Sequence, residues 1–275
     1  MNDEVREFHF CRDDFEQVRS VLYNAAGIKL ADTKDSMVYS RLARRLRALK
    51  IPSFAEYLRF LKTNSDELEH FINGLTTNLT AFFRENHHFD ALQNHLTHAT
   101  GRQRIWCAAS STGEEPYSIA MCAAEAYGTL TPPVDILATD IDSNVLATAS
   151  VGIYPAQRVN DMRNDRLKRF FHKGKGSSAG KVRVVPELQQ LITFTRLNLT
   201  DAHWPQIKGP FDVIFCRNVM IYFDKETQLR VLRRLVGLLN DGGLYFAGHS
   251  ESFLNAADLI RPVGKTVYRK VGRHD

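Results

Sequence analysis

Cysteine is scarce in this chain, and its few copies are not arranged for metal binding. The 275 residues include 4 cysteines, which lie far apart and form no Cys-x-x-Cys pair. This spacing argues against both a zinc site and a disulfide framework. The histidines also lack neighbours at metal-ligand spacing, so we predict reduced thiols and no metal.

Long apolar runs are missing as well. No stretch approaches the roughly 18 apolar residues that a membrane-spanning helix needs, and the first residues, Met1-Asn-Asp-Glu-Val-Arg-Glu, are charged. We therefore expect no secretion signal and no membrane insertion, which makes the cytoplasm the expected location. Because 44% of the residues are hydrophobic, the chain has enough apolar material for a core of its own.

Neither sign of charge dominates the composition. The formal net charge is +5 and the isoelectric point is about 9.0. Such a modest excess fits a nucleic-acid binder and an enzyme with an acidic protein substrate equally well. The distribution of the charges along the chain has to decide between these classes.

The order of apolar patterns predicts two domains. Residues 13–75 carry apolar side chains at helical spacing, interrupted at Gly27, at Ile51-Pro52 and at residues 63–65. After residue 100 the pattern changes to alternating strands and helices, which predicts an α/β fold with a doubly wound parallel sheet. We expect a small N-terminal all-α domain at 1–85, a linker helix at 86–100 and the α/β domain at 101–275.

Short apolar segments separated by helical ones define the expected sheet. The predicted strands are Ile105–Ala109, Val134–Thr139, Leu191–Leu197, Phe211–Cys216 and Gly243–Ala247. Between the second and third of them lies a long insert at 154–187, whose alternation and glycines predict a small antiparallel β-subdomain. The last segment, 260–271, predicts a closing hairpin.

The turn after the first predicted strand consists of small residues. Residues 107–113, Cys-Ala-Ala-Ser-Ser-Thr-Gly, let backbone N–H groups approach a ligand at the start of the next helix. Glu114 and Glu115 then stand where a pyrophosphate would need neutral or positive groups, and no complete Gly-x-Gly-x-x-Gly is present, which argues against a nicotinamide oxidoreductase. This polarity suits a cationic ligand, and S-adenosylmethionine carries an ammonium and a sulfonium. Which of the two carboxylates makes the main contact stays open.

Polar residues also follow the second and third predicted strands. Asp140 ends the second strand, where a doubly wound fold places a carboxylate against ribose hydroxyls. The alternative is that Asp140 or Asp142 only caps the following helix. Asn198 and Leu199 close the third strand, where an amide and an apolar group suit an adenine ring.

The fourth predicted strand runs directly into polar residues. Ligands of open α/β sheets bind at the carboxyl edge of the strands, so side chains placed there are candidates for binding. At this edge the strand is followed by Arg217, Asn218 and Tyr222.

Five motifs, in order along nearly the whole chain, resemble those of the chemotaxis receptor methyltransferases. They are Thr77-Asn-Leu-Thr-Ala-Phe-Phe-Arg84-Glu, Ser111-Thr-Gly-Glu-Glu-Pro-Tyr-Ser, Ala138-Thr-Asp-Ile-Asp, Phe215-Cys-Arg-Asn-Val-Met-Ile-Tyr-Phe-Asp and Ala247-Gly-His-Ser-Glu. The resemblance implies a Rossmann-like class I methyltransferase fold. It also implies methyl transfer from S-adenosylmethionine to glutamates of bacterial chemoreceptors, with S-adenosylhomocysteine as the product.

The same resemblance implies a set of site residues. Arg84 and Tyr222 would border the transferred methyl group. Cofactor contacts would come from Asn78, Thr80, Arg84, Glu115, Asp140, Asn198, Leu199, Arg217 and Asn218.

Methylation of a carboxylate makes modest chemical demands. A sulfonium methyl needs an in-line nucleophile at about 3 Å and no metal. A glutamate with an ordinary pKa of about 4.3 is already ionised at neutral pH, so no strong general base is required. We expect Arg84 to orient the cofactor or the acceptor carboxylate and Tyr222 to align the nucleophile, whereas the alternative for Arg84 is a structural ion pair.

A basic helix gains meaning from the resemblance. Arg41, Arg44, Arg45, Arg47 and Lys50 lie opposite an apolar stripe of Val38, Leu42, Leu46 and Leu49. The alternative is an ordinary solvated helix surface. With the resemblance, we expect this cationic face to dock on an acidic receptor helix.

The expected partners follow from the same family. The insert resembles the β-subdomain with which some members bind a peptide at the receptor's C-terminal tail as an added strand. We expect a monomer recruited to membrane-bound receptor arrays through the receptors' cytoplasmic domains. The competing classes are a nucleic-acid methyltransferase, which would show steep salt dependence, and a non-enzymatic interaction module with a dead cofactor pocket.

Overall fold

The protein folds as two compact units. The computed structural model describes residues 6–253 and 256–272. One unit comprises Met1–Thr77 with Tyr222–Thr227, and the other comprises Asn78–Ile221 with Gln228–Asp275. The division at Thr77 comes before the predicted boundary after residue 85, because segment 78–85 bonds to the second unit. Its Phe83 N–H, for example, donates to Ser118 Oγ at 2.9 Å.

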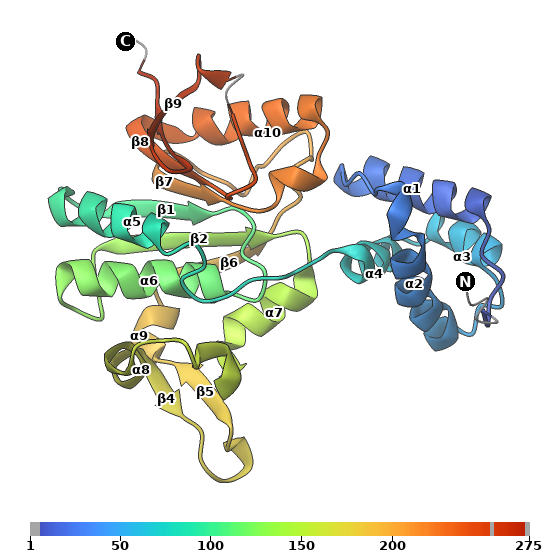
Figure 1. The fold of residues 1–275 in the computed structure, drawn as a ribbon, viewed down its shortest axis with the longest axis horizontal. Coiled ribbons are helices and arrows are strands. Elements are labelled where there is room, and N and C mark those ends of the chain that lie inside the picture. The colour runs from blue at the N-terminus through green and yellow to red at the C-terminus, as the bar shows by residue number, and fades with distance from the viewer. Residues whose placement is uncertain (1–5, 254–255, 273–275) are drawn as a thin grey trace. The chain divides into compact units, whose positions relative to one another are not determined.

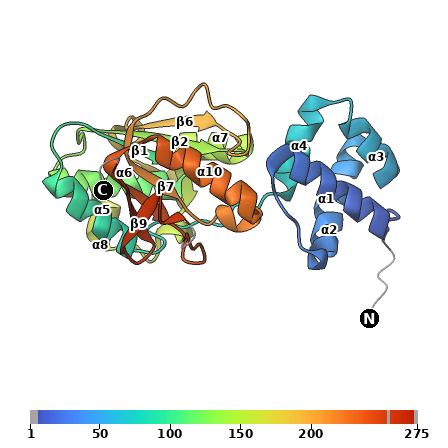
Figure 2. The same ribbon diagram turned by 90° about the horizontal axis from the view of Figure 1, so that it is seen from above.

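The first unit is all-helical, as predicted (Figure 2). Its α-helices are α1 (Arg12–Ala26), α2 (Asp35–Leu49), α3 (Phe54–Leu61) and α4 (Ser65–Leu75), with a 3₁₀ turn at Asp32–Lys34. The predicted breaks are confirmed: α1 ends at Gly27 in the left-handed conformation (φ 67°), and Asn64 caps α4 by accepting a hydrogen bond from Glu67 N–H. The predicted apolar stripe of α2 is buried at Val38, Leu42 and Leu46.

The second unit is built on one seven-stranded sheet, whose order is β6-β2-β1-β7-β8-β10-β9 (Figure 1). All pairs from β6 to β8 are parallel, and β10 is antiparallel to both β8 and β9. The five predicted strands and the closing hairpin are therefore confirmed. The strands are β1 (Gln103–Cys107), β2 (Val134–Asp140), β6 (Ile192–Arg196), β7 (Phe211–Cys216), β8 (Leu239–Ala247), β9 (Ile260–Gly264) and β10 (Val267–Lys270).

The strand order reverses between β1 and β7, and this switch point marks the expected position of the ligand site. From β1 the chain proceeds to β2 on one side, whereas from β7 it proceeds to β8 on the other. Right-handed crossovers then put the connecting helices on opposite faces and open a crevice at the carboxyl ends of β1 and β7. The helices of this unit's main fold are α5 (His87–His98), α6 (Glu114–Tyr127), α7 (Ser143–Val151), α9 (Pro186–Gln189) and α10 (Lys225–Gly237).

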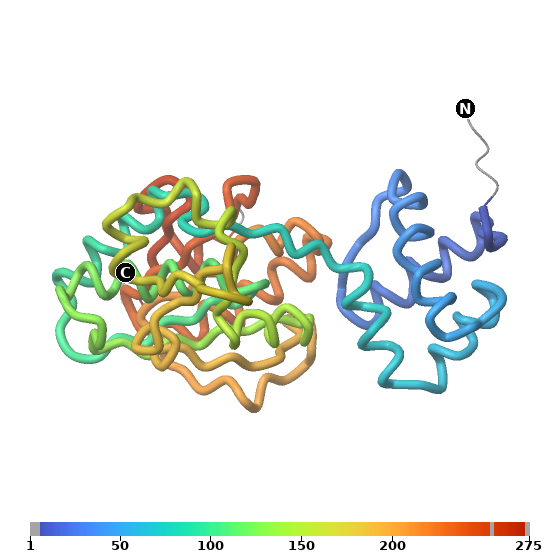
Figure 3. Tube along the Cα trace, turned by 90° about the horizontal axis from the view of Figure 1, so that it is seen from below, coloured from blue at the N-terminus to red at the C-terminus, as the bar shows by residue number. Residues whose placement is uncertain are grey.

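The predicted insert forms a separate three-stranded antiparallel sheet of order β3-β5-β4 (yellow-green to yellow in Figure 3). An unpredicted helix, α8 (Asn164–Phe170), precedes β4, so the insert is more than a ribbon. Its other elements are β3 (Ile153–Pro155), a 3₁₀ turn at Ala156–Val159, β4 (Phe171–Lys173), a second 3₁₀ turn at Gly176–Ser178 and β5 (Lys181–Val184).

Within the described ranges, no helix combines the length and the apolar character needed to cross a bilayer.

Candidate active site

The turn between β1 and α6 is tightly constrained. Ser111 adopts a left-handed backbone (φ 47°), and Gly113 has φ 97°. A Cβ at position 113 would lie 2.8 Å from both Ala149 Cβ and the Tyr154 hydroxyl, so only glycine fits there. The turn therefore holds its backbone against α7 and the insert, and leaves small side chains toward the crevice.

Asp140 and Asp142 have different hydrogen-bonding tasks, which answers the question of which one caps the helix. Asp142 caps α7 by accepting a hydrogen bond from Asn144 N–H at 2.9 Å. Asp140, 9% exposed at the end of β2, instead accepts from Ser111 N–H at 2.8 Å and from Asp142 N–H at 3.0 Å. Burial raises the pKa of Asp140, although these backbone donors oppose the rise. Asp140 thus stays available as an acceptor for ligand hydroxyls.

Glu115 and Arg217 form the central ion pair. Arg217 Nη1 donates to Glu115 Oε2 at 2.5 Å, and Arg217 Nη2 donates to the Arg84 carbonyl at 2.5 Å. The Cys107 thiol donates to the other Glu115 oxygen at 3.2 Å, and burial together with Glu115 raises the pKa of this thiol well above its usual value. Arg217 Nε is buried and has no hydrogen-bond partner among the described residues. The pair consequently keeps one N–H, at Arg217 Nε, that none of the described residues accepts.

Glu114 differs from its neighbour. Its side chain is only 1% exposed, and Thr112 Oγ1 donates to Glu114 Oε2 at 2.6 Å. Glu114 Oε1 lies 3.7 Å from Arg158 Nη1. Glu115 pairs with Arg217, and Glu114 lies near Arg158 of the insert. The two carboxylates therefore contact different parts of the unit.

Two glutamates that the sequence analysis did not single out organise the turn after β7. Glu251 Oε1 accepts from Val219 N–H at 3.0 Å and Met220 N–H at 2.8 Å, and burial raises the pKa of Glu251. Glu85 Oε1 accepts from Asn218 Nδ2 at 3.5 Å, and Glu85 Oε2 lies 3.4 Å from Arg217 Nη2. Glu85 and Glu251 are each the last residue of a motif that carried the family resemblance. Their position in these motifs was the sequence signal that could have identified them.

The backbone around these glutamates is strained. Glu85 and Asn218 both adopt positive φ angles, 59° and 57°. A Cβ on Gly248 would lie 2.7 Å from Asn218 N, so the close approach of the two loops requires glycine there. Strain of this kind in non-glycine residues persists only when surrounding contacts impose it, and it clusters at functional sites.

Segment 78–84 joins the same site. Asn78 Nδ2 donates to Asp142 Oδ2 at 2.8 Å, and the Asn78 carbonyl accepts from Ser111 Oγ at 2.9 Å. Arg158 Nη1 donates to the Thr80 carbonyl at 3.2 Å. Arg84 Nη1 donates to the Leu79 carbonyl at 3.0 Å. The structure therefore brings Asn78, Thr80 and Arg84 to the elements that carry Asp140 and Arg217.

Asn198 and Leu199 follow β6. The side chain of Asn198 is hydrogen-bonded within its own turn, and Leu199 is buried. Asn198 Nδ2 donates to Asp201 Oδ1 at 2.8 Å, and Asn198 Oδ1 accepts from Thr200 N–H at 3.0 Å. Leu199 is 6% exposed. The Asn198 amide thus serves its own turn in this structure.

Tyr222 ends the 3₁₀ turn Met220–Tyr222 and is grouped with the helical unit. Its carbonyl accepts a hydrogen bond from Lys29 N–H at 2.8 Å.

The basic residues of α2 do not form one uniform solvated face. Arg45 Nε donates to Glu67 Oε1 at 2.7 Å, and the Glu67 side chain is 3% exposed. Arg41 Nη1 donates to the Thr76 carbonyl at 2.6 Å, just beyond the end of α4. Arg44, Arg47 and Lys50 are exposed, and Arg47 pairs with Glu7 at 2.8 Å. Arg44, Arg47 and Lys50 therefore make up the exposed part of the predicted cationic face, whereas Arg41 and Arg45 bond to partners within the helical unit.

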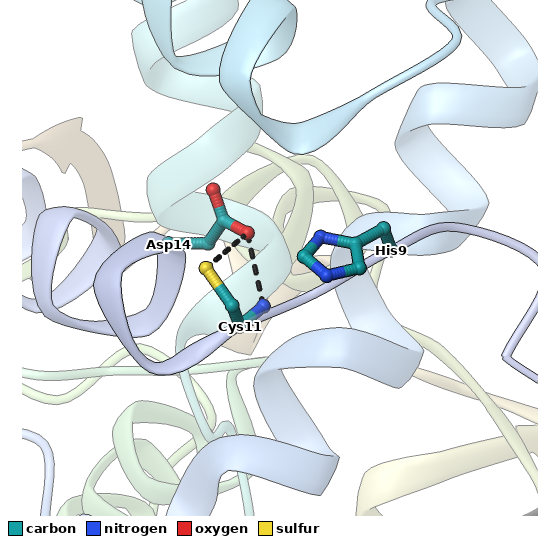
Figure 4. Close-up of side chains that lie close together, drawn as sticks. All are labelled: His9, Cys11 and Asp14. Atoms are coloured by element: carbon teal, nitrogen blue, oxygen red, sulfur yellow. Dashed lines mark hydrogen bonds between the residues drawn. The ribbon is translucent and has the colours of Figure 1, made fainter.

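Two groups of side chains have metal-ligand chemistry in the described part of the chain: His9, Cys11 and Asp14, and Glu85, His87 and His88. In the first group, the Cys11 N–H and thiol both donate to Asp14, which makes these two residues the capping box of α1 (Figure 4). In the second, the Arg217 guanidinium near Glu85 opposes a further cation. Burial, followed by the charge of Arg217, also lowers the pKa of His88 to about 3.

The residues at the crevice fit S-adenosylmethionine. Carboxylates surround the turn, and the buried Glu85 Oε2, Glu114 Oε1 and Arg217 Nε have no hydrogen-bond partner within the described residues. Unsatisfied buried groups of both signs suit a ligand that carries an ammonium, a sulfonium and a carboxylate.

Comparisons with known proteins agree with this chemistry. The family model for the CheR methyltransferase SAM binding domain matches residues 78–269, and that for the CheR methyltransferase all-alpha domain matches residues 13–76. Chemotaxis protein methyltransferase 2 of Pseudomonas aeruginosa is 55% identical over 266 residues, covering 96% of this chain and 95% of that protein. The chemotaxis protein methyltransferase of Escherichia coli K12 is 49% identical over 256 residues, with coverage of 92% and 89%. The chain therefore belongs to the CheR methyltransferase family and is an S-adenosylmethionine-dependent methyltransferase.

Proposed function

We propose that the protein transfers a methyl group from S-adenosylmethionine to glutamate side chains in the cytoplasmic domains of chemoreceptors. The products are glutamate methyl esters and S-adenosylhomocysteine. The observation that carries this proposal is that the partly unsatisfied Glu115–Arg217 pair and the buried Asp140 both lie at the carboxyl ends of parallel strands of one sheet. The names of the relatives, which are chemotaxis methyltransferases, support the same substrate class.

The cofactor is assigned to the crevice at β1 and β7. Asp140 receives the ribose hydroxyls, Glu115 the ammonium group and Arg217 the carboxylate end. Bound there, the cofactor supplies an electrophilic methyl on its sulfonium. The remaining contacts are assigned to Asn78, Thr80, Arg84, Asn198, Leu199 and Asn218, and Asn198 has to exchange its present hydrogen bonds to take part.

Catalysis by this chain is positioning rather than acid–base chemistry. The acceptor carboxylate is ionised at neutral pH, since an ordinary glutamate has a pKa of about 4.3. Arg84 orients that carboxylate, with its own position fixed by the bond to the Leu79 carbonyl. Tyr222 aligns the acceptor by hydrogen bonding. Tyr222→Phe should therefore lower turnover while leaving cofactor affinity intact.

Docking is assigned to the helical unit and to the insert. In the first, Arg41, Arg44, Arg45 and Arg47 of α2 dock on the acidic receptor helix, with Arg44 and Arg47 the more exposed of the four. In the insert, an edge strand of the small sheet accepts the receptor's C-terminal peptide as an added strand. These contacts recruit a monomeric cytoplasmic enzyme to receptor arrays.

The direct test uses methyl-labelled S-adenosylmethionine and receptor-containing membranes. Mild base should release labelled methanol, which is the signature of a carboxyl methyl ester. Membranes whose receptors carry glutamine at the acceptor positions are the control and should give none. Base-stable label on protein, or label on added RNA or DNA, would contradict the proposal and point to another acceptor.

A further inference from the structure

An exposed leucine stands beside the arginine assigned to the reacting centre. The Leu79 side chain is 75% exposed, although its two neighbours belong to the site. Three consecutive carbonyls hold the backbone here: that of Asn78 accepts from Ser111 Oγ, that of Leu79 from Arg84 Nη1 and that of Thr80 from Arg158 Nη1. An apolar side chain is thus presented to solvent on a fixed backbone.

The groups around Leu79 present positive charge. Arg158 comes from the insert, and its side chain is 47% exposed. Glu114 lies 3.7 Å from Arg158 and partly neutralises the guanidinium from the interior of the unit. Because the Glu114 side chain is only 1% exposed, its carboxylate is not accessible to a partner. The accessible surface next to Leu79 therefore combines an apolar contact with a cation.

The two features adjoin each other on the surface. Arg158 Nη1 donates to the carbonyl of Thr80, the residue that follows Leu79, so one partner segment can contact both. On an α-helix, side chains three or four residues apart are neighbours on one face, with about 5–6 Å between Cβ atoms. An apolar residue and a carboxylate one turn apart on a helix can meet Leu79 and Arg158 together.

We propose that Leu79 and Arg158 form a recognition surface for the acceptor segment, which is an acidic amphipathic helix of the substrate. Leu79 packs on an apolar residue next to the target glutamate, and Arg158 pairs with a second carboxylate one turn away. This inference rests on the proposed function and adds residues that decide which glutamates are methylated. Leu79 acts by excluding water and retaining the helix, and Arg158 by charge.

The test measures KM for a purified chemoreceptor cytoplasmic fragment that the wild-type chain methylates, at saturating S-adenosylmethionine. Leu79→Ser and Arg158→Gln should each raise this KM about fivefold to tenfold. Added salt should shrink the effect of Arg158→Gln and leave that of Leu79→Ser unchanged. Calorimetry with S-adenosylhomocysteine should give affinities within about twofold of wild type for both.

Matched controls come from the same unit. Val263→Ser removes another exposed apolar side chain, 46% exposed on β9, and Arg163→Gln removes another exposed guanidinium of the insert, which pairs with Asp165. Both should leave KM for the receptor fragment unchanged.

Three results would overturn the inference. Unchanged KM in both test variants excludes the recognition surface, and a parallel loss of S-adenosylhomocysteine affinity assigns the two residues to support of the cofactor site. Failure of the wild-type chain to methylate any receptor fragment defeats the proposed function and this inference with it. Unchanged variants of an active wild type defeat the inference alone.

Discussion

Each of the two units buries a glutamate against an arginine, and the two pairs differ in how completely they are bonded. In the helical unit, Glu67 Oε1 accepts from Arg45 Nε at 2.7 Å and from the Tyr57 hydroxyl at 2.8 Å, while Arg45 Nη2 donates to Oε2. Both oxygens are satisfied. This pair fixes α2 against α3 and α4.

The pair in the second unit is left incomplete. Both Glu115 oxygens are bonded as well, one to Arg217 and one to the Cys107 thiol, but Arg217 Nε has no hydrogen-bond partner among the described residues, and neither has the neighbouring Glu85 Oε2. Native proteins rarely leave buried polar groups unpaired without a functional reason. The saturated pair accordingly joins three helices, whereas the pair at the sheet edge keeps a buried N–H that no described residue accepts, which is consistent with the ligand site proposed there.

The largest expected effect is on the unsaturated pair. Glu115→Gln should weaken S-adenosylhomocysteine binding roughly 100-fold, or about 2.7 kcal/mol, because the ammonium group of the ligand loses the carboxylate proposed to bind it. Stability should change little, since Glu85 remains 3.4 Å from Arg217. Calorimetry and urea unfolding measure the two quantities. Unchanged S-adenosylhomocysteine affinity together with lost stability would show that the Glu115–Arg217 pair is structural, like the Glu67–Arg45 pair.

The reverse outcome is expected for the saturated pair. Glu67→Gln strands the Arg45 guanidinium and should lower the free energy of unfolding of the helical unit by about 2 kcal/mol, less than for a fully buried pair because the Arg45 side chain is 29% exposed. Cofactor affinity should equal that of wild type, because none of the proposed cofactor contacts lies in the described helices of this unit. Glu115→Gln is the matched control, with the same chemical change at the other pair. If Glu67→Gln leaves the free energy of unfolding unchanged, a fully hydrogen-bonded ion pair does not necessarily stabilise the fold.

The sequence predicted the strands well because buried parallel strands are short apolar runs, and β2 and β7 end where their polar residues begin. It selected Asp140 for the ribose but left open which of Asp140 and Asp142 caps the following helix. Both belong to one Asp-Ile-Asp segment, and their tasks are decided by Ser111 N–H and Asn144 N–H, which come from different turns. Such tertiary hydrogen bonds leave no periodic trace in a sequence.

The basic helix shows the same limit. Periodicity correctly placed the arginines of α2 away from its apolar stripe. It did not predict that Arg45 bonds to Glu67 on α4, because the partner of a long side chain depends on how the helices pack. Glu85 was missed for a related reason, since its left-handed backbone (φ 59°) has no glycine to mark it.

A smaller effect should follow from removing one donor of the saturated pair. Tyr57→Phe deletes the hydroxyl that donates to Glu67 and keeps the buried ring, so the free energy of unfolding should fall by about 1 kcal/mol. Thermal and urea unfolding of the variant measure it. In the Glu67→Gln background the same substitution should have less effect, because its charged acceptor is gone. Full additivity would mean that the hydroxyl contributes independently of Glu67.

The smallest expected effect is a difference in pH dependence. Burial alone would raise the pKa of Glu67, but the hydrogen bonds from Arg45 and Tyr57 outweigh it and hold the pKa below its ordinary 4.5. A lowered carboxyl pKa contributes stability that is complete above the unfolded value and is lost as pH falls through the folded value. Wild type should therefore lose its advantage over Glu67→Gln on acidification below about pH 4.5. Asp140, whose pKa is raised by burial, contributes the opposite slope in both proteins and cancels in their difference. Parallel stability curves for the two proteins would mean that the ionised Glu67 adds nothing to the fold, and the contrast between the two pairs would then rest on cofactor binding alone.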